Sequence, residues 1–181
     1  PVFWIVSLGI GALAMFITGL LFHQVAIFID NGLTAGAAAA AFVPIALAMA
    51  IFSIGSGFLL DRVPARVVLS SALIVLSAAL LLTPTVDSLI PIIFFGLLLG
   101  SATGLMRTLS GSIWAIYFGR LHLGSINGVA RAIVIAGAAL GPMPFGISRD
   151  VTGSYGTALI LSGIVSLGLG ILAFFIREPK T

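Results

Sequence analysis

Two arginines stand inside otherwise apolar stretches of this chain, and their guanidinium groups are its best candidates for chemistry. Arg107 precedes a run of hydroxyl and aromatic residues, and Arg131 lies about two helical turns into the next apolar stretch. A planar guanidinium donates two parallel hydrogen bonds to a carboxylate, so these residues point to the binding of an anion. A guanidinium at such a depth either faces a water-filled cavity or reaches the surface or a backbone carbonyl.

Four further polar side chains could complete such a site through hydrogen bonds. His23 and Gln24 form the most polar group of the first apolar stretch, Tyr117 stands late in the fourth, and Asn127 opens the fifth. We take Arg107 as the main cationic contact because it lies only a few ångströms from the middle of its stretch. The other five residues are secondary candidates for binding the same small anion.

The composition shows what kind of protein must position these side chains. Hydrophobic residues make up 60% of the chain and charged residues 7%, whereas a soluble domain has about 25% charged residues. The chain is therefore an integral membrane protein. Its net charge of +3 comes without a basic run, which argues against nucleic acid as a partner. The absence of cysteine and of clustered histidine and acidic residues gives no reason to expect a metal or cofactor.

Six apolar stretches are long enough to cross a membrane, which takes about 20 residues in a helix. They cover residues 2–29, 34–60, 67–84, 89–118, 125–148 and 155–176. The short connections make successive helices antiparallel neighbours, and no alternating strand pattern is present. We therefore predict an all-α, six-helix membrane domain over residues 1–181. Pro44 predicts a bend in the second helix, and we expect the third and sixth helices to be peripheral, the third facing lipid.

The distribution of lysine and arginine predicts the orientation of the six helices. Five of these residues flank the second and fourth connections or follow the last helix, and only Arg149 lies on the opposite side. The five are Arg62, Arg66, Arg120, Arg177 and Lys180. Because positive residues are retained in the cytoplasm, we expect the C-terminus to be cytoplasmic.

The second connection carries a charged turn between two apolar helices. Gly57, Asp61, Arg62 and Arg66 are spaced G-x3-D-R-x3-R, and a turn with three charges must lie at a membrane surface. This turn resembles motif A of the major facilitator superfamily, which joins the second and third helices of each six-helix half. The resemblance implies a conformational gate in which Asp61 meets Arg120 or a helix N-terminus of the other half.

Two further features carry the same resemblance. Residues 128–146 read G-x8-G-x3-G-P-x2-F-G, which is similar to motif C of the superfamily, and their glycines and prolines would serve packing and bending. The runs 18–24, 117–126 and 150–155 resemble the C-terminal half of bacterial monocarboxylate-transporter-like members. That subgroup tends to carry an arginine deep in the second helix of this half, where this chain has none.

The resemblance implies a fold, a partner and a function. The fold would be a six-helix half built from two inverted three-helix repeats, and the partner an N-terminal six-helix half. The function would be secondary active transport of a small, monocarboxylate-like organic anion by alternating access in a bacterial inner membrane. Because the chain opens with Pro1 inside an apolar run, we expect it to be part of a longer polypeptide.

Two other classes of function compete with transport. An intramembrane serine protease needs a histidine on a late helix, but His23 is in the first helix and His122 in a connection, so we do not expect an enzyme. A non-transporting membrane sensor or assembly module is compatible with the glycine-rich helices. The intramembrane arginines argue against it because helix packing alone does not require them.

Overall fold

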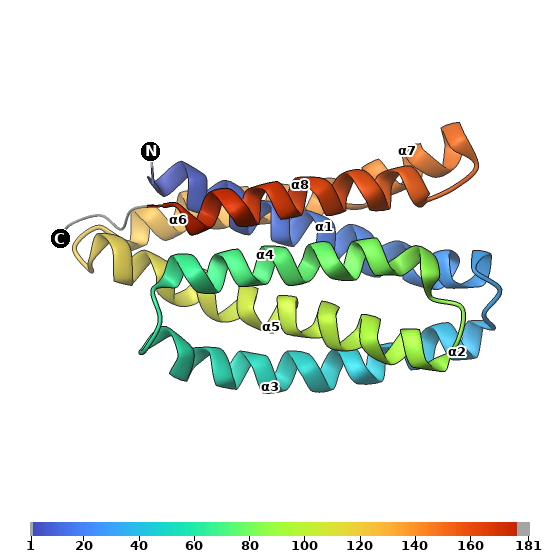
Figure 1. Ribbon diagram of the computed structural model, residues 1–181. Helices are drawn as coiled ribbons and strands as arrows, with labels where there is room; N and C mark the ends of the chain where they lie inside the picture. The colour runs from blue at the N-terminus through green and yellow to red at the C-terminus, as the bar shows by residue number, and fades with distance from the viewer. Residues whose placement is uncertain (1, 177–181) are drawn as a thin grey trace.

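The computed structural model describes residues 2–176, which form eight α-helices and one 3-10 helix and contain no strand (Figure 1). The elements are α1 (Val2–Asp30), α2 (Ala35–Ala40), α3 (Phe42–Leu60), α4 (Ala65–Leu82), η1 (Thr83–Thr85), α5 (Leu89–Phe118), α6 (Leu123–Leu140), α7 (Pro142–Thr152) and α8 (Gly156–Phe174). They compose six spans that are long and apolar enough to cross a membrane: α1, α2 with α3, α4 with η1, α5, α6 with α7, and α8. The prediction of an all-α membrane domain with six spans is confirmed.

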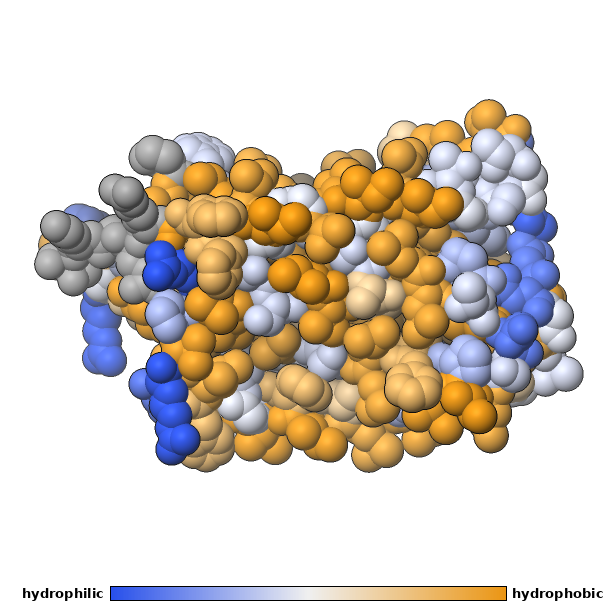
Figure 2. All heavy atoms as spheres, viewed as in Figure 1, coloured by the Kyte–Doolittle hydropathy of each residue, from blue (hydrophilic) through white to orange (hydrophobic). Residues whose placement is uncertain are grey.

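The surface has the layout that a membrane requires. Apolar side chains cover the middle of the molecule, and the most hydrophilic residues gather at its two ends (Figure 2). The connection between α3 and α4 lies at one end, and the connection between α1 and α2 lies at the other (Figure 1). This chain is therefore that of a multi-pass membrane protein.

Two of the six spans are broken by proline. Pro44 has no N–H to donate to the Ala40 carbonyl. Helix α2 ends at Ala40, and α3 begins at Phe42. In the fifth span Pro142 cannot bond the Ala138 carbonyl, which instead accepts the N–H of Gly141 at 3.2 Å. The helical hydrogen bonding is interrupted at both prolines, whereas Ala41 and Gly141 keep helical backbone angles. The bends expected there stay predictions.

Glycines let α5 pack closely against the second span. Cβ atoms on Gly96 and Gly104 would come within 2.6 Å of Pro44 Cγ and 2.7 Å of the Met49 carbonyl oxygen, and one on Gly100 would meet the Ile45 carbonyl. The four-residue spacing places all three on one face of α5, so α3 approaches almost to backbone contact. Glycine at every fourth position of a membrane helix is the sequence pattern expected for such a groove.

The expectation of a lipid-facing third span is wrong in part: 56% of its apolar window is buried, and one side, with Ile74 and Leu81, is exposed. One side of α4 is buried against α5 and α8, and three serine hydroxyls join α4 to α8. Ser70 and Ser77 donate to the carbonyls of Gly170 and Gly163, both at 2.7 Å, and Ser166 of α8 donates to the Leu73 carbonyl at 2.8 Å. Gly163 and Gly170 bring α8 within hydrogen-bonding distance of α4, so these serines lie in a tight helix interface.

Removing these three hydroxyls should destabilise the α4–α8 pair. Hydrogen bonds between membrane helices contribute about 0.6 kcal/mol on average, so the triple variant Ser70→Ala, Ser77→Ala, Ser166→Ala should lose about 2 kcal/mol of unfolding free energy. Denaturant titration of the detergent-solubilised protein measures this loss. Ser71→Ala is the matched control, because Ser71 bonds the Val67 carbonyl of its own helix. An equal loss in the control would contradict an interhelical role.

Helix α1 crosses the fifth span at two pairs of glycines. A Cβ on Gly137 would lie 2.5 Å from the Gly11 carbonyl oxygen, and one on Gly19 would meet the Gly141 carbonyl. A Cβ on Gly141 would in turn meet the Met15 carbonyl. Because backbone cannot move aside as a flexible side chain can, this crossing admits no larger residue.

The substitution Gly141→Ala should therefore force α1 and the fifth span apart and cost about 1–3 kcal/mol of stability, as overpacking does in other cores. Gly146→Ala is the comparison, since a Cβ there meets no atom of the described chain within 4 Å. We expect its melting temperature to stay the same or rise. Equal melting temperatures for the two variants would show that the crossing tolerates a methyl group.

Candidate functional site

Arg107 and Arg131 line the same cavity, which has a volume of about 350 Å³ and lies between α1, α5 and α6. The sequence identified each arginine separately, and the fold brings them together. The cavity lining consists of Ile10, Met106, Arg107, Ser110, Gly111, Trp114, Ala130, Arg131, Val134 and Ile135. Pockets for small ligands are typically 300–1,000 Å³, so this cavity suits a small molecule.

Helical periodicity explains why these residues share one cavity. On α5, Arg107, Ser110, Gly111 and Trp114 recur at steps of three and four residues and so lie on one face. On α6, Ala130 and Arg131 are followed one turn later by Val134 and Ile135, which form a second face. Ile10 of α1 lies between the two helices, which pack mainly on different neighbours: α5 on α3 and α4, and α6 on α1.

Placed by the midpoints of their spans, the two arginines lie on the same side of the middle of the apolar region, and Arg107 is the nearer to it. The midpoint of the fourth span (89–118) is residue 103.5, so Arg107 is 3.5 residues beyond it, or about 5 Å at 1.5 Å per residue. The midpoint of the fifth span (123–152) is residue 137.5, so Arg131 is 6.5 residues before it, or about 10 Å. Because the two spans are antiparallel, both shifts point to the same membrane surface.

No carboxylate neutralises either arginine within residues 2–176, where the one ion pair joins Arg149 to Asp30. Arg107 Nη1 lies 3.8 Å from the Sδ atom of Met49, a weak acceptor, and Arg131 has no polar partner among the described residues. Both side chains are exposed in this chain. A charge left unpaired against hydrocarbon is costly, so this face must meet water, an anion or another polar surface.

His23 and Gln24 lie near the opposite end of α1 and do not line the cavity. His23 Nε2 is 3.2 Å from the Pro142 carbonyl oxygen, and its ring lies 5.2 Å from that of Tyr155. Gln24 is fully buried, and its side-chain amide donates to the Ala38 carbonyl at 3.3 Å. These contacts fix the broken second and fifth spans to α1.

Asn127 and Tyr117 lie closer to the cavity but are absent from its lining. Asn127 is half-buried one turn before Arg131 on α6, and Tyr117 is buried in the core one turn after Ile113 on α5. The structure thus unites two of the six predicted binding residues, both of them arginines.

The residues expected to form a gate lie at the end of the molecule where α3 meets α4. Arg66 Nη1 donates to the Ile176 carbonyl at 3.0 Å and so joins the start of α4 to the residues after α8. A Cβ on Gly57 would meet nothing within 4 Å, so no helix of the described chain uses the space beside it. Asp61, Arg62 and Arg120 are exposed, and the described residues include no ion pair between Asp61 and Arg120.

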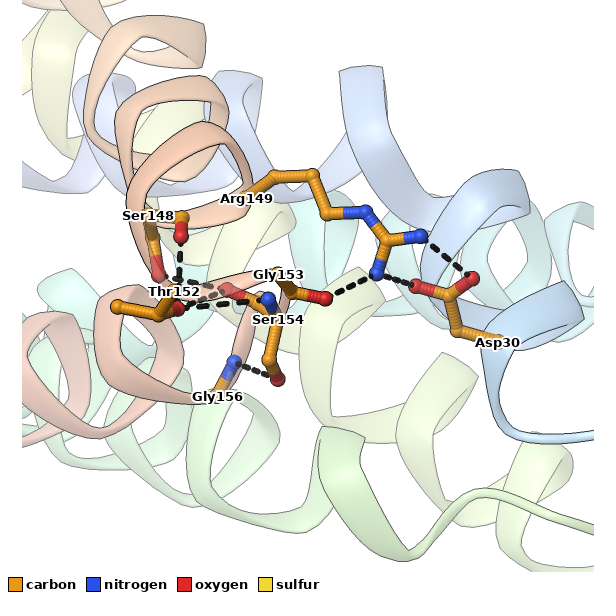
Figure 3. Close-up of polar contacts among 7 residues, drawn as sticks. All are labelled: Asp30, Ser148, Arg149, Thr152, Gly153, Ser154 and Gly156. Carbon is orange, nitrogen blue, oxygen red and sulfur yellow. Dashed lines mark hydrogen bonds and ion pairs between the residues drawn. The ribbon is translucent and has the colours of Figure 1, made fainter.

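The opposite end of the molecule carries an ion pair between Arg149 and Asp30 that the sequence analysis did not identify. Arg149, in the last turn of α7, reaches across to Asp30 at the end of α1 (Figure 3). The two guanidinium–carboxylate distances are 2.6 and 3.3 Å, and Nη1 also donates to the Gly153 carbonyl at 2.6 Å. The Arg149 guanidinium lies 5.4 Å from the centre of the Tyr155 ring. The sequence could have indicated this pair, because Arg149 is the one basic residue near the first, third and fifth connections, which carry several aspartates.

The sequence was compared with models of known protein families and with curated proteins, and neither comparison found a match. The fold and the site alone define the class of this protein: a multi-pass membrane protein with two arginines in one cavity.

The Asp30–Arg149 pair should contribute little to stability despite its geometry. The side chains are 36% and 42% exposed, and exposed ion pairs contribute about 0.2–1 kcal/mol. A double-mutant cycle of Asp30→Asn and Arg149→Gln isolates their coupling from the other contacts of Arg149. We expect a coupling in that range at low salt, measured by denaturant unfolding, and a smaller one at 1 M salt. A coupling that salt does not change would mean that the pair is shielded from solvent.

Proposed function

We propose that this protein carries a small organic anion across the membrane by alternating access, with Arg107 as the principal contact. The observation that supports this proposal is the cavity lined by two guanidinium groups that no carboxylate of the described chain neutralises. Structural arginines in membrane helices are normally paired. Two arginines without a carboxylate partner beside an open cavity are better explained by a ligand that brings the negative charge.

The cavity supplies both parts of such a binding site. Each guanidinium can donate two hydrogen bonds to one carboxylate, and these bonds are stronger in a site with little water. Ile10, Val134 and Ile135 supply apolar walls for the carbon skeleton of the anion. The resemblance to monocarboxylate-transporter-like proteins supports the same class of substrate.

The proposal includes an N-terminal six-helix half that covers the arginine-bearing face. Only 6% of the residues in the apolar window of the fifth span and 22% in the second are buried, compared with 61% in the first. Lipid could cover the apolar part of these faces but not Arg131, which is exposed there. A second half would enclose the cavity, and its helices could occupy the open space beside Gly57.

The remaining parts of the proposal concern gating and orientation. Asp61, Arg62, Arg66 and Arg120 are gathered near one end of the molecule, where they would close the path against the other half. The excess of arginine at that end supports a cytoplasmic location for it and for the C-terminus. The arrangement as two inverted three-helix repeats and the bacterial inner membrane are proposed from the resemblance.

Uptake by proteoliposomes tests the role of Arg107. The variant Arg107→Gln removes the charged donor, and hydrogen bonds to charged groups contribute about 1.5–3 kcal/mol, so carboxylate uptake should fall about tenfold or more. Arg107→Lys keeps the charge but loses the fork and should be intermediate. Thr103→Ala, one turn earlier, is the control because Thr103 bonds the Leu99 carbonyl of its own helix.

Normal uptake by Arg107→Gln, in protein that elutes as a folded species, would overturn the assignment of Arg107. Binding without uptake by the unmodified protein would instead favour the second candidate, a sensor or assembly module that uses the cavity only to recognise an anion. A ligand that binds the folded form raises the melting temperature, so binding and flux can be measured separately.

A further inference from the structure

We infer that the substrate is a dicarboxylate with an apolar spacer rather than a monocarboxylate, with Arg107 and Arg131 each holding one carboxylate. This inference rests on the proposed function of the cavity as an anion site. It goes beyond that function because the number, spacing and surroundings of the charges in the cavity select one class of anion.

The number of charges is the first argument. The cavity lining contains two cations and no anion, and all five acidic residues of the sequence lie near helix ends, in connections or in the C-terminal tail. A monocarboxylate would neutralise one guanidinium and leave the other without a negatively charged partner in the cavity. A dianion would neutralise both, so its second carboxylate adds a second charge-assisted contact to the cavity.

The spacing of the arginines is the second argument. By the span midpoints given above, Arg107 and Arg131 differ in depth by about 5 Å, and they project from different helices. This offset is between the backbone positions of the two arginines, so their side chains approach the cavity from different depths as well as from different helices. Two carboxylates separated by a short carbon chain match the arrangement better than a single carboxylate shared by both guanidiniums.

The cavity walls give the chemistry of the spacer. Ile10, Val134, Ile135 and Trp114 are apolar, and Ser110 is the one hydroxyl residue in the lining. A polyhydroxylated or strongly polar spacer would lose hydrogen bonds to water that these walls cannot replace. The walls therefore favour methylene or aromatic carbon between the two carboxylates.

Succinate and butyrate form a matched pair of probes, since both have four carbons and differ by one carboxylate. We expect succinate to raise the melting temperature of the solubilised protein at a concentration at least tenfold lower than butyrate. In proteoliposomes, labelled succinate should enter, and unlabelled succinate should compete at least tenfold better than butyrate. These measurements use the unmodified protein and do not depend on the folding of a variant.

Variants then assign the second carboxylate to Arg131. Arg131→Gln should reduce succinate affinity at least tenfold while leaving butyrate affinity within about threefold, so that the preference disappears. Arg131→Lys keeps the charge and should retain part of the preference. Arg107→Gln should weaken both ligands if Arg107 is the principal contact.

The outcomes separate this inference from the proposed function. Butyrate binding that equals or exceeds succinate binding, together with uptake, would overturn the dicarboxylate and leave transport standing. Selective succinate binding without uptake would overturn transport and leave the dicarboxylate standing. A loss of both ligands to the same extent in Arg131→Gln would overturn the two-point arrangement, and absence of binding and uptake for both probes would overturn both proposals.

Discussion

The cost of leaving a charge or an unpaired backbone group in hydrocarbon governs this structure. No water is available there, so every span is helical and the charged residues collect at the two ends of the molecule. Asp30 and Arg149 pair at one end, and Arg66 bonds a backbone carbonyl near the other. Arg107 and Arg131 depart from this rule, which is why the cavity between them is the strongest functional signal in the chain.

The same constraint explains how glycine and proline are used. Prolines at positions 44 and 142 interrupt the second and fifth spans because they cannot donate to the Ala40 and Ala138 carbonyls, the second of which accepts the Gly141 N–H. Gln24 donates to the Ala38 carbonyl beside one break, and His23 contacts the Pro142 carbonyl at the other. Gly11 and Gly19 of α1 lie against Gly137 and Gly141, which brings the fifth span close to α1. Gln24 and His23, which looked like part of a binding site from the sequence, therefore join α1 to the second and fifth spans.

Span positions could be predicted from the sequence because bilayer thickness alone sets the length of an apolar helix. The groove of Gly96, Gly100 and Gly104 was equally predictable, since a four-residue repeat defines one helix face. The environment of α4 could not be predicted, because nothing in the sequence around Ser70 and Ser77 shows that they bond carbonyls of α8. The meeting of Arg107 with Arg131 also depended on the packing of α5 and α6 around α1, which no local pattern encodes.

The placement of the two arginines has a consequence for how a ligand could act on the fold. Helix α5 packs chiefly on α3 and α4, whereas α6 packs chiefly on α1, so the cavity lies between two groups of helices. A ligand shifts a conformational equilibrium only by the difference in its affinity for the two states. A monocarboxylate held by Arg107 alone would sense movement of α6 only through its apolar contacts with Val134 and Ile135. A ligand held at both ends senses any change in the distance between α5 and α6, so two-point binding gives the substrate a direct means of favouring one conformation over another.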